Sequence, residues 1–405
     1  MQQTNRWLIV VSATLTHLLL GTVYAWSFFQ KPISETYGWS QSETAWTFSI
    51  AIFMLGITAA WSGGKTARFG VKKLAVTGTI LYAAGYIISY FALKYHLLFL
   101  LYFGFGIVGG IGLGMAYVTP VAAVSGWFPD KQGLATGMVV MGFGLGAFLM
   151  SKILAPFFLS LFRGNLENAF LAIGILLLVV HPLTAGLLRS KPVEGKPNSA
   201  IPAKLRYTII KADYVFIWLI FTFNIIAGMI FLAFQSPLLQ DILIMEGITD
   251  TMTLGQKGAT LIGISALFNG AGRIFWGTVS DKVGRIPTFR LLLGIEILVF
   301  LALIFTQHST VFFAGVCLVL LCYGGGFGVI PSLIKERYGS KLMATVYGIT
   351  LTGWGIGGIF GPQLIAILKD RFPDNAGVYS FYSGLGMLIL GFVLSFLIKR
   401  KVAAE

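Results

Sequence analysis

The stretch Gly277-Thr-Val-Ser-Asp-Lys-Val-Gly-Arg285 has a counterpart 214 positions earlier, where residues 63–70 read Gly-Gly-Lys-Thr-Ala-Arg-Phe-Gly. Each stretch follows an apolar run and forms a short basic loop bounded by glycine. A second repeat supports the first, because Phe29-Gln-Lys-Pro32 returns as Phe234-Gln-Ser-Pro237. The sequence therefore predicts two related halves.

Apolar runs of about twenty residues, each long enough to cross a hydrocarbon core, extend outward from these loops over the whole chain. Of the 405 residues, 56% are hydrophobic and only 11% are charged, too few polar groups for a water-soluble surface. We predict an all-α membrane protein with twelve transmembrane helices, six in each half. The predicted spans are residues 7–29, 42–62, 74–93, 97–123, 134–160, 168–188, 214–235, 258–279, 289–306, 310–333, 344–367 and 376–398.

The basic residues alternate from loop to loop, although the net charge of +14 could suggest a nucleic-acid partner. Of the 29 Lys and Arg residues, 21 fall on the side that holds the N-terminus and seven lie at or near the opposite side. Basic residues concentrate in cytoplasmic loops, so we expect a multi-pass protein of the cell (inner) membrane with both termini in the cytoplasm. Residues 189–213 are the longest polar connection and are predicted to be a cytoplasmic linker between two bundles, residues 1–188 and 214–405.

Glycine is dense at matching places in the two halves, in spans four and five and again in spans ten and eleven. Glycine-rich helices pack backbone to backbone, and two repeats with a site between them favour a carrier that rocks. The glycines are Gly104, Gly106, Gly109, Gly110, Gly112, Gly114, Gly137, Gly142, Gly144 and Gly146, and then Gly324, Gly325, Gly326, Gly328, Gly353, Gly355, Gly357, Gly358 and Gly361.

The loop that ends in Asp281, Lys282 and Arg285 resembles the cytoplasmic signature of the major facilitator superfamily. Within it, Asn269-Gly-Ala-Gly-Arg-Ile-Phe-Trp-Gly277 and Trp127-Phe-Pro-Asp-Lys131 resemble the monocarboxylate transporter family, its bacterial lactate transporters and the related oxalate/formate antiporter. The resemblance covers essentially the whole chain. It implies two pseudo-symmetric six-helix bundles and secondary active transport by alternating access, with the charged loop acting in the conformational change.

Arg273 is the one basic residue left well inside a predicted span. A guanidinium in hydrocarbon costs at least a few kcal/mol, so it must face protein or a water-filled cavity. It stays charged and binds a carboxylate in bidentate geometry, which predicts a substrate-binding role. The alternative is an internal ion pair with Glu296 in span nine.

The route of a coupled proton is less directly indicated. Asn269 shares a helical face with Arg273 and stands where animal monocarboxylate transporters commonly have an aspartate thought to take the proton. Phe28, also a candidate site residue, stands where they often carry a lysine. His17 shares a face with Tyr24 and Phe28 and is the other candidate for proton coupling, with a packing role as its alternative.

A small organic anion needs apolar walls and a few oriented donors. Trp354 stands where the oxalate antiporter has a lysine that provides a second positive charge. One cation balances one carboxylate, and a second, unpaired carboxylate would cost several kcal/mol. The resemblance implies that the cavity is lined by Tyr24, Tyr117, Phe143 or Leu145, Tyr323 and Trp354, with Asn224 offering an amide.

We therefore predict a carrier for short monocarboxylates such as L-lactate or pyruvate, coupled to a proton and acting as a monomer in the lipid bilayer. An oxalate/formate-type antiporter is the alternative. No phosphate loop, metal cluster or nucleophile with its base occurs in the sequence, so neither an enzyme nor a cofactor or metal is expected. Cys317 and Cys322 are interpreted as packing residues.

Overall fold

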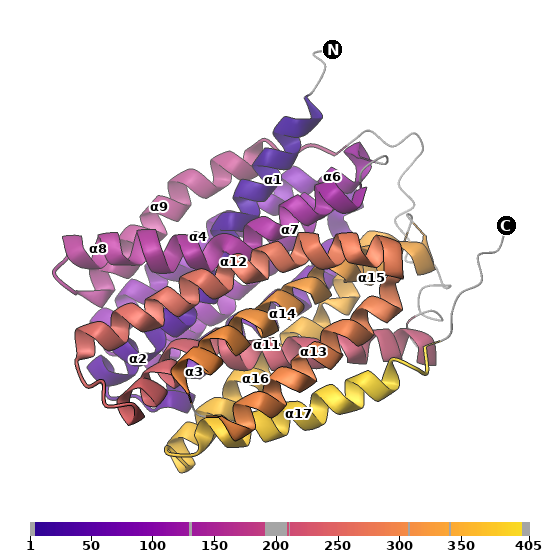
Figure 1. The fold of residues 1–405 in the computed structure, drawn as a ribbon. Helices are drawn as coiled ribbons and strands as arrows, with labels where there is room; N and C mark the ends of the chain where they lie inside the picture. Colours follow the sequence, from indigo (N-terminus) through magenta and orange to yellow (C-terminus); the bar gives the residue numbers. More distant parts are fainter. Residues whose placement is uncertain are drawn as a thin grey trace.

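The computed structural model describes residues 5–128, 132–190, 209, 211–306, 308–339 and 342–398. Within these ranges every regular element is a helix, and the helices run roughly along one common direction (Figure 1). The predicted all-α membrane fold is confirmed. The predicted motif residues 129–131 and most of the predicted linker lie outside the described residues.

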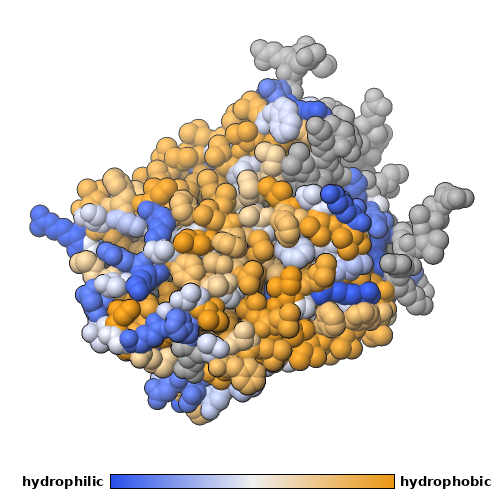
Figure 2. All heavy atoms as spheres, viewed as in Figure 1, coloured by the Kyte–Doolittle hydropathy of each residue, from blue (hydrophilic) through white to orange (hydrophobic). Residues whose placement is uncertain are grey.

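In the part of the chain that the structure describes, eleven helical spans are long and apolar enough to cross a membrane. Hydrophobic residues dominate the middle of the face shown in Figure 2, and hydrophilic residues gather toward its two ends, as a bilayer requires. The eleven spans are Arg6–Tyr37, Gln41–Thr66, Val71–Lys94, Leu98–Trp127, Ala135–Leu161, Leu166–Gly186, Ala212–Met245, Arg285–Phe305, Ser309–Tyr338, Thr345–Arg371 and Ala376–Leu394.

The remaining predicted span, residues 258–279, lies inside α12 (Thr251–Val283). This helix has 33 residues, which is ample length, but Asn269, Arg273 and several glycines make it more polar than the eleven. It nevertheless packs between α7 (Gln132–Leu149) and α14 (Ser309–Tyr338) as a full member of the bundle. The polar residues that weaken its membrane signal are those that the sequence assigns to a site.

Three spans contain a 3₁₀ or π-helical segment. The first span consists of α1 (Arg6–Leu20), a 3₁₀ segment η1 (Gly21–Ala25) and α2 (Trp26–Tyr37). At Gly21 the backbone of α7 comes so close that an added Cβ would lie 2.0 Å from the carbonyl oxygen of Phe143. This approach places Tyr24, within η1, beside α7. The other interruptions are π-helical: η2 (Tyr102–Gly109) between α5 (Leu98–Leu101) and α6 (Gly110–Trp127), and η3 (Met150–Leu154) between α7 and α8 (Ala155–Leu161).

The remaining helices are continuous except near residue 351. They are α3 (Gln41–Phe69), α4 (Val71–Lys94), α9 (Leu166–Gly186), α11 (Ala212–Met245), α13 (Arg285–Phe305), α15 (Met343–Thr350), α16 (Thr352–Arg371) and α17 (Ala376–Leu394). Helices α1–α9 mostly neighbour one another, and so do α11–α17. The two groups meet along α3 with α15 and α16, and along α7 with α12.

Paired glycines bring these two groups together. A Cβ at Gly144 would lie 2.8 Å from the backbone of Gly270, and a Cβ at Gly56 would lie 2.8 Å from the backbone of Gly355. Real Cβ atoms do not approach backbone this closely, so Gly144 and Gly56 need to be glycine in this conformation. The glycine-rich contact expected from the sequence therefore includes α7 against α12 and α3 against α16.

We name the two ends of the bundle after their turns. The Gly38 end carries the α2–α3 turn, and the Gly284 end carries the α12–α13 turn. At the Gly38 end the carboxylate of Asp370, on α16, accepts hydrogen bonds from the backbone N–H groups of Gln41 (3.1 Å) and Ser42 (3.0 Å). A side chain from one group of helices thus caps α3 in the other.

Candidate functional site

Arg273 lies at the middle of the contact between α7, α12 and α14, with none of its surface exposed. Its Nε donates to Asn269 Oδ1 at 3.3 Å, one turn back on the same helix. The guanidinium carbon lies 4.8 Å from the ring centroid of Phe327 and 5.7 Å from that of Phe143. Among the described residues, neither terminal nitrogen has a hydrogen-bond partner and no carboxylate lies within ion-pair distance.

Aromatic rings enclose this guanidinium from both groups of helices. Trp354 packs edge-on against Phe327 and Tyr117, with ring centroids 4.7 and 4.9 Å apart. The hydroxyl groups of Tyr24 and Tyr323 are hydrogen-bonded to each other across the interface. We call the following set, all fully buried, the central cluster: Tyr24, Tyr117, Phe143, Arg273, Tyr323, Phe327 and Trp354.

Donors without partners converge on the central cluster. The Tyr117 hydroxyl lies within interaction range of Arg273 and of the Tyr347 hydroxyl, but these contacts lack hydrogen-bond geometry. The indole nitrogen of Trp354 is also unpartnered within the part of the chain described. A buried donor that makes no hydrogen bond costs roughly 1–3 kcal/mol. The cluster is therefore rich in donors for an acceptor group, and its one charge is positive.

The sequence left open whether Arg273 pairs with Glu296. In this conformation Glu296, on α13, accepts a hydrogen bond from Asn224 Nδ2 at 2.9 Å instead. Asn224 was predicted to offer its amide to the substrate, but its amide nitrogen faces α13. Among the described residues, the Arg273 guanidinium therefore has no acidic partner.

His17 and Asn269, the proton-coupling candidates, both lie beside the central cluster. The His17 ring stacks on Tyr117 with centroids 4.8 Å apart, and its Nε2 lies 2.9 Å from the Tyr117 carbonyl oxygen. A carbonyl only accepts, so Nε2 carries the hydrogen. Asn269 holds the Arg273 Nε, which is a positioning role rather than a titrating one.

Two predicted lining residues lie outside the central cluster. Leu145 packs against Gly270 at the α7–α12 contact. Phe28 lines a separate cavity of about 360 Å³ at the Gly38 end, between α2, α11 and α12. We call it the α2–α12 cavity. In its lining, Lys31 of α2 donates a hydrogen bond to Gln240 Oε1 of α11 at 3.0 Å.

Sequence reasoning did not assign Phe327 and Tyr347 to the site. Phe327 follows Tyr323 by four residues, and Tyr347 precedes Trp354 by seven, so each shares a helical face with a predicted residue. That spacing was a usable signal in both cases.

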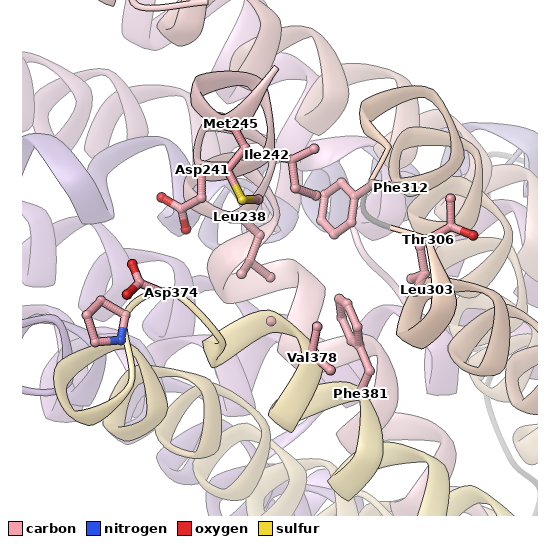
Figure 3. A pocket seen from close by; sticks show the side chains of 12 residues that line it. Leu238, Asp241, Ile242, Met245, Leu303, Thr306, Phe312, Asp374, Val378 and Phe381 are labelled. Carbon is pink, nitrogen blue, oxygen red and sulfur yellow. The ribbon is translucent and has the colours of Figure 1, made fainter. Parts of the chain in front are cut away.

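A second hollow lies among the C-terminal helices, at the Gly38 end of α11, α13, α14 and α17 (Figure 3). It encloses about 50 Å³ and is lined mainly by apolar side chains such as Leu238, Phe312 and Phe381, with Asp241 and Asp374 to one side. It holds no residue of the central cluster.

The charged segment that the sequence predicts to be a loop is largely helical: Asp281 and Lys282 lie in the last turn of α12, and Arg285 begins α13, at the Gly284 end. Arg285 forms ion pairs with Asp281, one turn back, and with Glu336 of α14 at 3.6 Å, while Lys282 is exposed. These contacts tie the ends of α12, α13 and α14 together.

Comparison with known proteins agrees with this architecture. Residues 9–362 match the sequence model of the Major Facilitator Superfamily. The chain is 25% identical to the oxalate:formate antiporter of Oxalobacter formigenes, covering 92% of this chain and 87% of that protein. It is 26% identical to monocarboxylate transporter 13 of Bos taurus, covering 90% and 83%. The crystal structure of a bacterial homolog of the human lysosomal transporter Spinster shares the fold, with a TM-score of 0.69, 18% identity and 98% of both chains covered.

Proposed function

This chain belongs to the Major Facilitator Superfamily, and from that premise we propose that it carries short monocarboxylates such as lactate or pyruvate by alternating access. The observation that supports this proposal is the buried Arg273 guanidinium, whose two terminal nitrogens have no partner among the described residues. A carboxylate has the charge and the pair of acceptor atoms that those nitrogens match.

In the proposed cycle the anion binds Arg273 and neutralises it. The hydroxyl groups of Tyr117 and Tyr347 are the next donors within reach of the same region, and they orient the second oxygen or the substrate hydroxyl. A buried unpaired charge opposes closure of the bundle around it, whereas a paired one does not. Neutralisation therefore favours the closed form with substrate inside.

The monocarboxylate relatives and the oxalate:formate antiporter suggest different substrates. Trp354 supports the first, because it is a neutral ring packed against Tyr117, Phe143 and Phe327 where a second cation would serve a second carboxylate. Arg273 is the one positive charge of the central cluster. A dicarboxylate would leave one carboxylate buried without a partner.

The remaining parts of the proposal concern membrane placement and coupling. The excess of basic residues at the Gly284 end supports cytoplasmic termini in the cell membrane. We further propose that residues 1–188 and 214–405 are the moving bundles and that the protein acts as a monomer. We also propose that the anion moves with a proton, so that the loaded site is neutral. Exchange of one anion for another, as the name of the antiporter describes, is the alternative.

The test is uptake of labelled lactate into liposomes that contain purified protein. Arg273→Ala should lower uptake roughly a hundredfold, since loss of a buried charge partner costs about 3 kcal/mol. Arg273→Lys should retain part of the activity, because lysine keeps the charge but not the bidentate fork. Arg163→Ala, at an exposed turn, is the matched control and should transport normally.

Competition by other anions and an imposed pH gradient separate the alternatives. Unchanged uptake by Arg273→Ala would remove the basis of the proposal. Stronger inhibition by oxalate than by lactate would favour the antiporter. Uptake that ignores the pH gradient but responds to an opposing anion would replace symport with exchange.

A further inference from the structure

Glu296 is a carboxyl group buried in the C-terminal helices, and no cation among the described residues lies within ion-pair distance of it. It lies on α13 with none of its surface exposed. Its Oε1 accepts from Asn224 Nδ2 at 2.9 Å, and its Oε2 has no partner among the described residues. An unpaired carboxylate in such a place would be costly, whereas a carboxylic acid is neutral.

The unpartnered atoms of this pair are complementary if Glu296 holds a proton. Asn224 Oδ1 is also buried without a partner in the described chain, and as a carbonyl oxygen it only accepts. A protonated Oε2 is a donor, and a carboxylic acid facing a carboxamide can form two antiparallel hydrogen bonds. The proton would satisfy both orphaned oxygens at once.

The described surroundings of Glu296 contain one other ionisable side chain and no charged one. The thiol of Cys322, on α14, is the ionisable neighbour, and Asn224 faces it from α11. The described parts of α12 and α17 contribute no charged group to its surroundings. Arg273 is not among its partners either.

The pair is joined to the central cluster through the glycine run of α14. A Cβ at Gly326 would lie 2.1 Å from Asn224 Oδ1, and a Cβ at Gly328 would lie 2.2 Å from the Arg273 carbonyl oxygen. Phe327, between these glycines, packs on the guanidinium. Because α14 contacts both Asn224 and Arg273, we expect a movement of Asn224 against α14 to shift the residues around Arg273.

We infer that Glu296 is a proton-binding site, closed by Asn224, and that it supplies the proton carried with the anion. Oε2 gains a proton from water when its side of the bundle is open, holds it on Asn224 Oδ1 in the closed form, and returns it to water on the other side. With one proton and one monocarboxylate, the pair moves without net charge. The transport role rests on the proposed function, but the protonation does not.

Glu296→Gln imitates the protonated acid, because its amide can donate to Asn224 Oδ1 and accept from Nδ2. In liposomes it should keep lactate exchange at equal pH within about twofold and lose accumulation driven by a one-unit pH gradient, which can reach about tenfold in wild type. Glu296→Asp should restore part of the gradient response. Glu167→Gln, at the start of α9, is the control and should behave as wild type.

Two measurements make the outcomes separable. Infrared difference spectra of the wild type at neutral pH should show a buried protonated carboxyl band that Glu296→Gln lacks. The absence of this band overturns the inference even if lactate is transported, and its presence in a protein that transports no lactate leaves the proton site but removes the proposed function. Gradient-driven accumulation by Glu296→Gln at the wild-type level overturns the inference, as does loss of exchange together with loss of lactate binding.

Discussion

In the proposed site, Trp354 is the residue that favours a monocarboxylate over a dicarboxylate substrate. Its indole is fully buried, in edge contact with Tyr117 and Phe327, and it carries no charge. A cation here would stand beside Arg273 and provide a second binding point for an anion.

Trp354→Lys should therefore shift competition toward dicarboxylates. We expect the ratio of oxalate to lactate inhibition to rise about tenfold, the effect of about 1.4 kcal/mol, because the new ammonium offsets part of the cost of the second carboxylate. The measurement is inhibition of labelled lactate uptake by each anion. Trp354→Leu, which removes the ring without adding charge, should weaken both and leave their ratio unchanged; an unchanged ratio in the lysine variant would contradict this account of selectivity.

For single residues, the sequence predicts a role best where the residue type has few possible roles at that place in the fold. An arginine inside a span has few roles, so Arg273 could be selected as a candidate site residue without a structure. Asn224 could not be oriented, because an amide serves a substrate or a buried acid equally well. Its partner Glu296 lies 72 positions away, and only the packing of α11 against α13 brings them together.

Among the helices, the close contact of α3 with α16 depends on the glycine at position 56. Gly56→Ala should slow transport several-fold, because a Cβ 2.8 Å from the Gly355 backbone would separate the two groups of helices and disfavour this conformation. Uptake by the purified variant is the measurement, with thermal unfolding to show that each group still folds. Gly64→Ala, on the same helix with nothing within 4 Å of the added Cβ, is the matched control. Equal rates for the two variants would mean that the contact does not take part in transport.

The helices were predicted more accurately than their irregularities. Apolar length gave the spans, but the predicted first span stops at residue 29, whereas the helical span continues to Tyr37 beyond Pro32. The turn η1 and the π-helical segments were not foreseen. They depend on contacts such as Gly21 against Phe143, between residues far apart in sequence.

Across the whole molecule, the Asp370 cap on α3 joins the two groups of helices at the Gly38 end. Asp370→Ala should favour opening at this end by about fivefold, since loss of a helix cap costs about 1 kcal/mol. A cysteine at Ser27, a buried residue lining the α2–α12 cavity, reports the change through its rate of modification by a membrane-impermeant maleimide. Asp374→Ala, on the following turn, should leave the rate unchanged. If the Asp370 and Asp374 variants react alike, the cap is not part of the closure.

The polar character of α12 has a consequence for how the protein is made. An arginine at the centre of a span disfavours insertion by about 2.5–3.5 kcal/mol, and α12 is the long helix that falls outside the eleven apolar spans. During synthesis it reaches the bilayer after α7 and before α14. Phe143 of α7 is then already in the membrane to cover the guanidinium, whereas Phe327 has not yet been made. We therefore expect the two halves to begin to associate before the second is complete, and a second half expressed alone to insert α12 poorly.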